Sequence, residues 1–510
     1  MKKIILSAVA AVATLSLVSC NTDFDNDVKD IQVTSGEVNF SKYVALGNSL
    51  TSGFRDYALY IDGQNESYPA ILAQQMKLAG GGEFFQPMMA DNIGGLLLGG
   101  MPIQGTKLYI SGFNNGSPVL SNAAGTPSTE VTNHISGPIN NFGVPGLKSY
   151  HLVAPGYGNV AGIANNTANP YFVRFASSGT TTLLQDAVAQ QATFFSLWGA
   201  NNDVLSYATS GGVGVNQTGN LNPATYGAND ISDPDLVAGV LRQTIEAMKA
   251  AGATGGVIAN TPSVTSIPLF TTVPYNPVSP AAIGSNLTML NTSLYGPLKA
   301  ALTAFGAGDR IELLSATSAN PVLIVDESLP NLSAQLTQAL TPTLGATMAA
   351  QFGMLFGQAR QSKPADRILL TTASVIGTTA PGYPSPVNIY GITLPLEDKY
   401  VLTEAEVAEV ETATDAINAR IKNLAATYNL AFVDAHKKMV ELNASSGIQF
   451  NGVKYSAKFV TGGTFSLDGI HLTGKGYAIV ANEFIKAINA KYKSNLPEVN
   501  PNNYSSVKFP

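Results

Sequence analysis

The chain has 510 residues, of which 45% are hydrophobic and 12% are charged, and its formal net charge is −6 at pH 7. This hydrophobic fraction is large enough to bury a core and excludes a disordered chain, while the acidic balance argues against nucleic acid as a partner. The sequence shows no repeat with a period of roughly 20 to 50 residues, which argues against a solenoid or a propeller.

The first 19 residues have the pattern of an export signal. Lys2 and Lys3 precede an apolar run from Ile4 to Leu17, which is too short for a stable membrane span. The run ends in Leu17-Val18-Ser19-Cys20, which resembles the lipobox of a bacterial lipoprotein. We therefore expect residues 1–19 to be a signal peptide and Cys20 to be acylated. The alternative is an ordinary secretory signal with a chance cysteine. Cys20 is the only cysteine, so its acylation leaves no thiol for a disulfide, a metal site or catalysis.

An acidic tether is predicted between Cys20 and the folded part of the chain. Residues 21–27 contain three aspartates, and they resemble the acidic stretch that follows the lipidated cysteine in surface lipoproteins of Bacteroidetes-type bacteria. Any solvated linker has a similar composition, which is the alternative interpretation. We expect a tether over 20–38, a folded domain over 39–510, and an exported protein anchored in the bacterial outer membrane and exposed at the cell surface.

Five short apolar runs are predicted to form a parallel sheet. They span residues 43–47, 139–143, 193–198, 256–260 and 430–434. Each run is continuously apolar, as in parallel strands that are covered on both faces. Loops rich in Gly, Asn, Ser and Thr lie between them, at residues 91–135, 155–182 and 207–232.

Three helices have clear start signals. Asp233 is placed to cap the first, with Pro234 at its first position. Thr403 opens the second, and Glu406 stands where it completes a capping box. Thr473 is placed to cap the last helix. Strands and helices alternate along the chain, so we expect an α/β sandwich with a largely parallel sheet.

A large insertion is predicted at about 262–400, between the fourth and fifth strands. Inside it, Thr341-Pro342 predicts the start of a helix. The residues predicted to share its apolar face are Leu344, Met348, Phe352, Leu355, Phe356 and Ala359. Two interpretations stay open: a helix that packs the inserted region, or a lid or acyl-binding wall over the active site.

Polar groups with the chemistry of an esterase follow the predicted strands. In a parallel sheet, ligands bind at the carboxyl ends of the strands. There Ser49 supplies a nucleophile, His471 a base for its proton, and Asp468 a carboxylate that orients the base. The backbone N–H groups of Ser49 and Gly146, with the side-chain amide of Asn202, are donors for an oxyanion. His436 is the rival base, which we interpret as mainly structural; His134 and His151 carry little signal.

Four motifs in this order resemble the SGNH, or GDSL-type, hydrolases. They read GNSL at 47–50, GVPG at 143–146, GANND at 199–203 and DGIH at 468–471. The resemblance implies a serine esterase or lipase on a three-layer α/β/α, flavodoxin-like fold that needs no metal and no cofactor. It also assigns the nucleophile to Ser49, the oxyanion donors to Gly146 and Asn202, and the remaining pair to Asp468 and His471.

The motifs depart from the family pattern at two points. Asn48 stands where the family has aspartate, which is not the triad acid. The third motif reads Ala200-Asn201-Asn202-Asp203 in place of Gly-x-Asn-Asp, so either asparagine is a candidate donor. We favour Asn202, because it directly precedes Asp203 as in the motif.

The leading hypothesis is a lipid-anchored serine hydrolase of carboxylic esters, borne by a small molecule or a polymer. Lipid or acyl esters and O-acetyl groups on polysaccharide both fit the sequence. The alternative is a non-catalytic surface lipoprotein that binds glycan or lipid on the same fold, which Asn48, Ala200 and the long glycine-rich loops favour. In either case the expected partners are a ligand of this kind and a membrane reached through Cys20.

Overall fold

The computed structural model describes residues 32–114 and 116–510. The predicted signal peptide, Cys20 and most of the acidic tether lie outside the described residues. The chain is already fixed to the body at Thr34, whose N–H donates to the side chain of Asn495 at 2.6 Å. Val38 lies in the main core, so packing begins before residue 39.

A five-stranded sheet lies at the centre of the larger lobe, and all its pairings are parallel. In spatial order the strands are β13 (Ala431–Val433), β8 (Gly255–Ala259), β7 (Phe194–Trp198), β1 (Tyr43–Gly47) and β6 (Asn141–Gly143). Strands β1, β7 and β8 are buried at every residue. Burial on both faces explains why these segments are continuously apolar. All five predicted strands are present, with small shifts at their ends.

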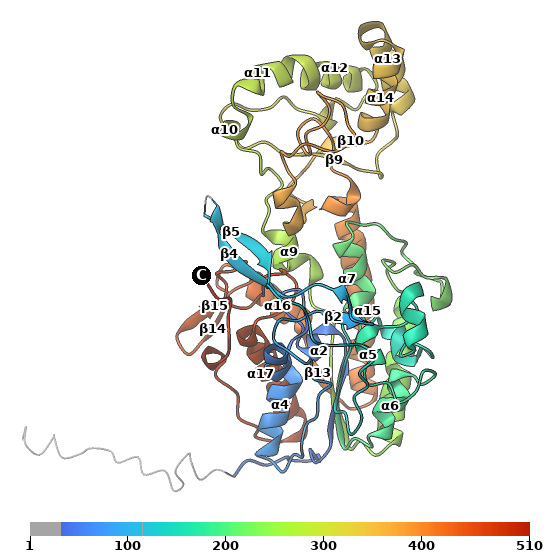
Figure 1. Cartoon of the computed structure of the whole chain (residues 1–510), viewed down its shortest axis with the longest axis vertical. Helices are drawn as coiled ribbons and strands as arrows, with labels where there is room; N and C mark the ends of the chain where they lie inside the picture. Colours follow the sequence, from blue (N-terminus) through green and yellow to red (C-terminus); the bar gives the residue numbers. More distant parts are fainter. Residues whose placement is uncertain (1–31, 115) are drawn as a thin grey trace, which may run out of the picture.

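Helices cover both faces of the sheet and make three layers (Figure 1). Helix α17 (Gly474–Tyr492) packs against α4 (Tyr68–Lys77) on one side, and α15 (Glu404–Thr427) packs against α8 (Pro234–Ala250) on the other. The ring of Phe484 on α17 stacks on Tyr68 of α4 at 4.6 Å. This arrangement confirms the predicted three-layer α/β/α class.

The predicted start signals of α8, α15 and α17 are confirmed. The Asp233 carboxylate accepts from the N–H groups of Asp235 and Leu236. Glu406 accepts from the Thr403 N–H at 2.7 Å, and the Thr473 hydroxyl accepts from Gly476 at 3.2 Å. Within the described ranges, no helix combines the length and the apolar character needed to cross a bilayer.

A smaller lobe stands above the sheet lobe and is built from the inserted segment (Figure 1). It has its own hydrophobic core, drawn from residues between Val278 and Val401. Strands β9 (Leu323–Val325) and β10 (Ala359–Gln361) pair at its base, where Arg360 is buried and hydrogen-bonded to the carboxylates of Asp326 and Asp366.

The predicted helix start at Thr341-Pro342 is wrong. Helix α13 (Ser333–Leu344) already contains Pro342 in its last turn, and α14 (Ala346–Phe356) follows it. Gly345, with φ at +76°, separates the two helices, because glycine adopts this backbone conformation without strain. Phe352 and Phe356 are buried in the core of the smaller lobe, whereas Met348 is exposed. The hairpin therefore packs the inserted lobe, as the first of the two interpretations predicted.

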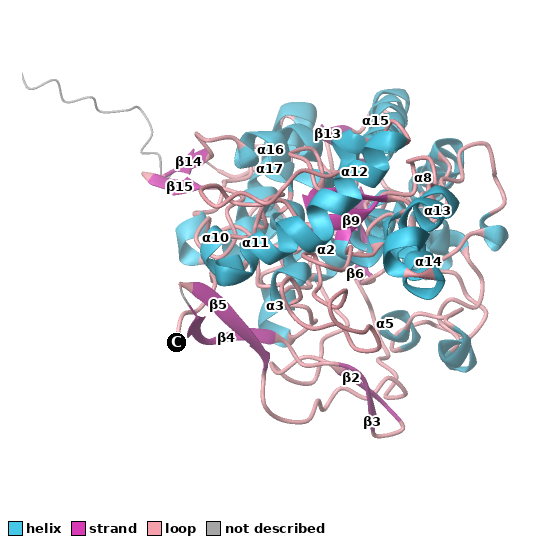
Figure 2. Cartoon of the chain, turned by 90° about the horizontal axis from the view of Figure 1, so that it is seen from above, coloured by secondary structure: helices cyan, strands magenta, loops and turns pink. Residues whose placement is uncertain are grey.

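Two hairpins occupy the segment expected to be a loop at 91–135. They are β2 (Leu96–Leu98) with β3 (Met101–Gln104), and β4 (Leu108–Asn114) with β5 (Ser117–Asn122). Figure 2 shows both at the rim of the body. Gly99 and Gly100, both at positive φ, form the two-residue turn of the first hairpin. A Gly-Gly pair is a known signal of such a turn, but here it lies in a segment that is rich in glycine throughout.

The remaining elements are short. The helices are α2 (Ser49–Ser52), α3 (Ile61–Asn65), α5 (Pro170–Val173), α6 (Leu183–Ala189), α7 (Asn202–Thr209), α9 (Pro268–Thr271), α10 (Pro280–Ile283), α11 (Leu287–Leu290), α12 (Gly296–Ala304) and α16 (Ala435–Asn443). The strands are β11 (Arg367–Ile368), β12 (Val401–Leu402), β14 (Ile448–Phe450) and β15 (Val453–Tyr455).

Candidate active site

Ser49 is the first residue of α2, directly beyond the carboxyl end of β1. The strand ends at Gly47, where a Cβ atom would lie 2.4 Å from the carbonyl oxygen of Trp198, so only glycine fits. Asn48 caps the helix, and its Oδ1 accepts from the Leu50 N–H at 3.3 Å. Asparagine and aspartate cap helices about equally well. Asn48 in place of aspartate therefore preserves the turn that presents Ser49.

Asp468 and His471 form a hydrogen-bonded pair in the turn before α17. His471 Nδ1 lies 2.9 Å from Asp468 Oδ2, and the other carboxylate oxygen accepts from the backbone N–H groups of Ile470 and His471. Gly469 has φ at +70° and allows the tight turn between them. The Asp468 side chain is 1% exposed and the His471 side chain 12% exposed. The imidazole is thus held from its Nδ1 side and remains accessible.

Asp468 is charged despite its burial. Desolvation on its own raises the pKa of this carboxyl, but the charge and hydrogen bond of His471, with the backbone donors, hold the pKa well below its usual range. A carboxylate in this state fixes the tautomer of the histidine, because Nδ1 must then carry a proton. His471 Nε2 is left free to accept one.

Ser49 and His471 lie at the same edge of the sheet, although no hydrogen bond joins their side chains in the described structure. Leu50, which follows Ser49, and Ile470, which precedes His471, line one cavity. Phe54, whose N–H donates to the Ser49 carbonyl, also contacts the imidazole, with ring centroids 4.8 Å apart. Catalytic hydrogen bonds are often long in ligand-free enzymes. The two residues are therefore close enough to be candidates for one site.

The predicted oxyanion donors come from two loops that are tied together. Gly146 is exposed, with φ at +80°. Its neighbour Leu147 accepts through its carbonyl from Asn202 Nδ2 at 2.8 Å. The Asp203 carboxylate accepts from both the N–H and the hydroxyl of Ser149, each at 2.9 Å. Among the described residues, the N–H groups of Ser49 and Gly146 have no hydrogen-bond partner, which leaves both available to a ligand.

The two asparagines of the third motif, Asn201 and Asn202, have different surroundings. Asn202 begins α7 and its amide reaches the Gly146 loop. Both polar atoms of the Asn201 side chain are buried without a partner in the described structure. The contact with the oxyanion loop favours Asn202 as the donor.

The other histidines have different surroundings. Among the described residues, only the His471 ring lies within hydrogen-bonding distance of a carboxylate. Burial, assisted by Lys148, lowers the pKa of His151 to about 3, and its ring stacks on Tyr157. The backbone of His436 donates to Asn260 at the start of α16. In the part of the chain that the structure describes, no group of three or more His, Cys, Asp or Glu side chains is placed to hold a metal ion.

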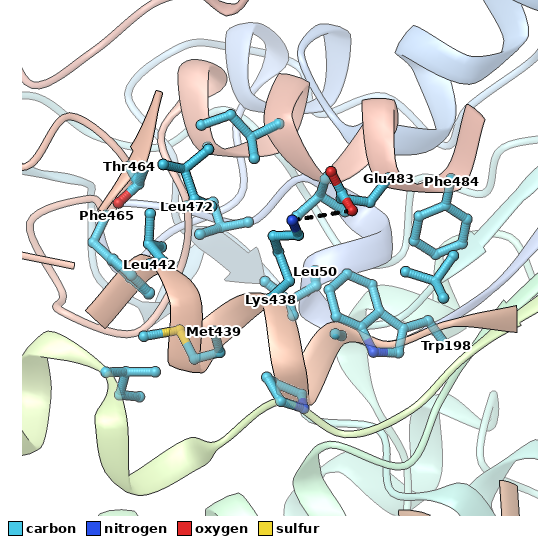
Figure 3. Close-up of a pocket in the computed structure, with 18 of the residues that line it drawn as sticks. Leu50, Trp198, Lys438, Met439, Leu442, Thr464, Phe465, Leu472, Glu483 and Phe484 are labelled. Carbon is cyan, nitrogen blue, oxygen red and sulfur yellow. Dashed lines mark ion pairs between the residues drawn. The ribbon is translucent and has the colours of Figure 1, made fainter. Parts of the chain in front are cut away.

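An apolar cavity of about 90 Å³ adjoins the candidate site (Figure 3). Its wall includes Leu50, Trp198, Met439, Leu442, Leu472 and Phe484. One ion pair, Lys438 with Glu483 at 3.4 Å, crosses it. No local sequence pattern predicts this cavity, because its wall comes from segments far apart in the chain.

The fold and the site define a class of protein: a three-layer α/β enzyme that hydrolyses ester bonds. Residues 317–484 match the family model of the GDSL-like lipases and acylhydrolases, so this segment of the chain is similar to that family. The matched residues include Asp468 and His471 but not Ser49, Gly146 or Asn202. No curated protein matches the sequence.

Solved structures give weaker likenesses. Axe2, an acetylxylan esterase from Geobacillus stearothermophilus, is 10% identical, with a TM-score of 0.31 over 91% of this chain and 98% of that chain. A catalytic mutant of the same esterase gives 10% identity and a TM-score of 0.32 over the same shares of the two chains. Likenesses this low carry no argument about the substrate.

Proposed function

We propose that the protein is a serine hydrolase that cleaves carboxylic esters through Ser49, His471 and Asp468. The Ser49 hydroxyl attacks the ester carbonyl while His471 Nε2 takes its proton, and Asp468 stabilises the imidazolium that forms. The N–H groups of Ser49 and Gly146, with the amide of Asn202, bind the oxyanion. His471 then returns the proton to the leaving alcohol, and a water molecule releases the acid from Ser49. The observation that carries this proposal is the Asp468–His471 pair packed through Phe54 against the helix of Ser49.

The apolar cavity supports an acyl ester as the substrate. Leu50 and Ile470, which follow Ser49 and precede His471 in the chain, line this cavity. An engineered cavity of about 150 Å³ holds benzene, so a cavity of about 90 Å³ has room for about three or four carbon atoms. We propose butanoyl and pentanoyl groups, which carry three and four carbon atoms beyond the carbonyl, as the best acyl chains. Each added methylene is worth about 0.8 kcal/mol, or about fourfold in kcat/KM, until the cavity is full.

The alternative, a non-catalytic ligand-binding protein, loses one of its reasons. Asn48 departs from the family motif, but its side chain caps helix α2 by accepting from the Leu50 N–H. Ligand binding that survives in both Ser49→Ala and His471→Ala, with no ester turnover by the wild-type protein, would support that alternative.

The test is turnover of p-nitrophenyl esters by the protein lacking residues 1–20, with acyl chains from two to twelve carbons. We expect Ser49→Ala and His471→Ala to lose activity by about 10⁴-fold or more, with unchanged circular dichroism. His436→Ala is the matched control and should keep wild-type activity. Full activity in Ser49→Ala would refute the proposal, and a preference for acetate would refute the acyl-chain assignment alone.

We also propose that acylated Cys20 anchors the protein to the outer membrane. The pattern at residues 17–20 supports this, and the 14 residues from Cys20 to Val33 span at most about 50 Å when extended. Metabolic labelling with an alkynyl fatty acid should mark the wild-type protein and not Cys20→Ala. Equal labelling of both would exclude the anchor.

A further inference from the structure

Two consecutive non-glycine residues, Asp56 and Tyr57, hold a backbone conformation that L-residues rarely adopt. Their φ angles are +53° and +65°. The left-handed region is unfavourable for residues with a Cβ atom, more so for a bulky one such as tyrosine. Such strain persists only where surrounding contacts enforce it, and it concentrates at functional sites.

The strained pair points its hydrogen-bonding groups at the turn that carries the catalytic acid. The Tyr57 N–H donates to Asp468 Oδ2 at 2.9 Å, and the Asp56 N–H donates to Ser466 Oγ at 3.0 Å. The Ser466 hydroxyl in turn donates to Asp468 Oδ1 at 3.1 Å. Asp468 Oδ2, which Tyr57 contacts, is the same oxygen that faces His471 Nδ1.

The Asp56 side chain completes the attachment. Its Oδ1 accepts from the Leu467 N–H at 3.1 Å, so it holds the backbone directly before Asp468. Its Oδ2 accepts from the Tyr60 hydroxyl at 2.6 Å. The bonds to Ser466 and Leu467 join positions about 410 residues apart in the chain, and they hold the backbone directly before Asp468.

A buried network holds this segment from behind. Arg55 Nε donates to the Tyr60 hydroxyl at 2.7 Å, and Arg55 Nη1 donates to Glu66 at 2.6 Å and to Ser505 at 2.8 Å. Arg55 is 5% exposed and Tyr60 is 3% exposed. Buried hydrogen-bond networks restrict the groups that they join, so this network supplies the restraint that the strained backbone requires.

We propose that residues 55–57 are a positioning clamp for the Asp468–His471 pair, with Asp56 as its central side chain. The inference rests on the proposed function, because it assigns the clamp a role in orienting the catalytic base. A misplacement of about 1 Å costs about 100-fold in rate. The clamp does not touch substrate; it sets the place of the carboxylate that orients His471.

Three substitutions at Asp56 separate the effect of its carboxylate from the effect of its backbone conformation. Asp56→Ala removes the carboxylate and should lower kcat by about 10- to 100-fold with KM within twofold. Asp56→Asn keeps an acceptor for Leu467 and a residue type that tolerates positive φ, and should recover most of the lost kcat. Asp56→Gly suits the positive φ but lacks the acceptor, so it should be as slow as Asp56→Ala.

Gln191→Gly and Asp186→Ala are the controls. Gln191 also has a positive φ, at +52°, and Asp186 is a buried aspartate that accepts from Ser177 and Thr181. Both variants should keep the wild-type kcat, whatever they do to the melting temperature. The rate of labelling by a fluorophosphonate, measured for each folded variant, should follow kcat.

The outcomes separate this inference from the proposed function. Failure of the wild-type protein to react with fluorophosphonate would overturn both. Wild-type labelling with an unchanged kcat in Asp56→Ala would overturn the clamp alone. A slow Asp56→Ala with wild-type kcat in Asp56→Gly would also overturn the role of the carboxylate, because only backbone shape would then matter.

Discussion

The two lobes differ in what their buried polar groups do. In the sheet lobe, buried polar residues such as Asp468 and Asp203 gather at the carboxyl ends of the strands and hold the loops of the candidate site. In the inserted lobe, the buried ion pairs of Arg360 lie at its base, where the Asp366 carboxylate also accepts from the Glu404 N–H at the start of α15. The first set of polar groups holds the loops of the candidate site, and the second set links the inserted lobe to the sheet lobe.

The first residues of the inserted segment pack in the main core, and they contact the turn that carries Asp468 and His471. The Leu269 N–H, near the beginning of the inserted segment, donates to the Gly469 carbonyl at 2.9 Å. Pro262 and Ile267 contribute to the apolar cavity, whereas no residue of the α13–α14 hairpin does. The start of the insertion thus contributes to the site, and its outer part does not. The comparison predicts that changes in the outer lobe alter stability, while changes at the sheet edge alter rate.

The largest stability effect is expected from Arg360→Ala. This change leaves Asp326 and Asp366 as buried carboxylates without their cation, which costs about 3–5 kcal/mol. Calorimetry should show a large fall in the melting temperature of the inserted lobe, while kcat below that temperature changes little. Lys363→Ala, at an exposed cation of the same lobe, is the matched control. A kcat loss as large as the stability loss would break the separation of roles.

Asn202→Ala should have the opposite effect, with a large loss of kcat and little loss of stability. Loss of one oxyanion donor costs about 100- to 1000-fold in kcat, with little change in KM. Asn201→Ala is the control, because its side chain has no partner in the described structure; it should stay within a few-fold of the wild-type rate. If Asn201→Ala were the slower variant, the donor would be assigned to the wrong asparagine.

Thr473→Ala tests an element shared by both properties. Its hydroxyl caps α17 and also donates to the Gly463 carbonyl at 2.8 Å. Loss of the cap should cost about 1 kcal/mol and reduce activity slightly, because His471 lies two residues before it. Urea unfolding measures the first effect and ester turnover the second. Thr473→Ser should restore both, and a variant as stable as the wild type would show that the cap contributes nothing.

The smallest expected effect is a pH dependence of the free energy of unfolding, to which Asp468 and Glu406 contribute with opposite signs. The pKa of Asp468 is below its usual value, so its contribution is present above about pH 4 and is lost as pH falls further. Burial raises the pKa of Glu406, beside the inserted lobe, from 4.5 to about 7. Its contribution is therefore present below about pH 4.5 and is lost as pH rises toward 7.

Melting temperatures measured between pH 5 and 8 check the second sign. Glu406→Gln keeps an acceptor for the Thr403 N–H and cannot ionise, so the decline in melting temperature over this range should be smaller than in the wild type. An unchanged or steeper decline would place the ionising group elsewhere.

The sequence was sufficient to predict the sheet and the residues of the Asp468–His471 pair. Parallel strands are buried on both faces, so each appears as an apolar run, and Asp468 lies close enough in sequence to His471 for the pair to be recognised. The structure confirms the fold class. The assignments of Ser49, Gly146 and Asn202 stay predictions; among the described residues, no hydrogen bond joins the side chains of Ser49 and His471.

Other features had no local signal. The clamp at Asp56 depends on backbone angles and on partners about 410 residues away, neither of which a residue pattern encodes. Pro342 does not begin a helix: α13 continues through it to Leu344, and the break comes at Gly345. In the sequence, the inserted lobe is recognisable only as a long segment between the fourth and fifth strands, because its core forms from contacts between distant segments.

The most direct measurement of the central claim is mass spectrometry of the protein after reaction with a fluorophosphonate. The account predicts a single modified residue, Ser49, and no modification of the His471→Ala variant on the same timescale. Modification of a different serine, or an unmodified Ser49 in a protein that turns over esters, would contradict it.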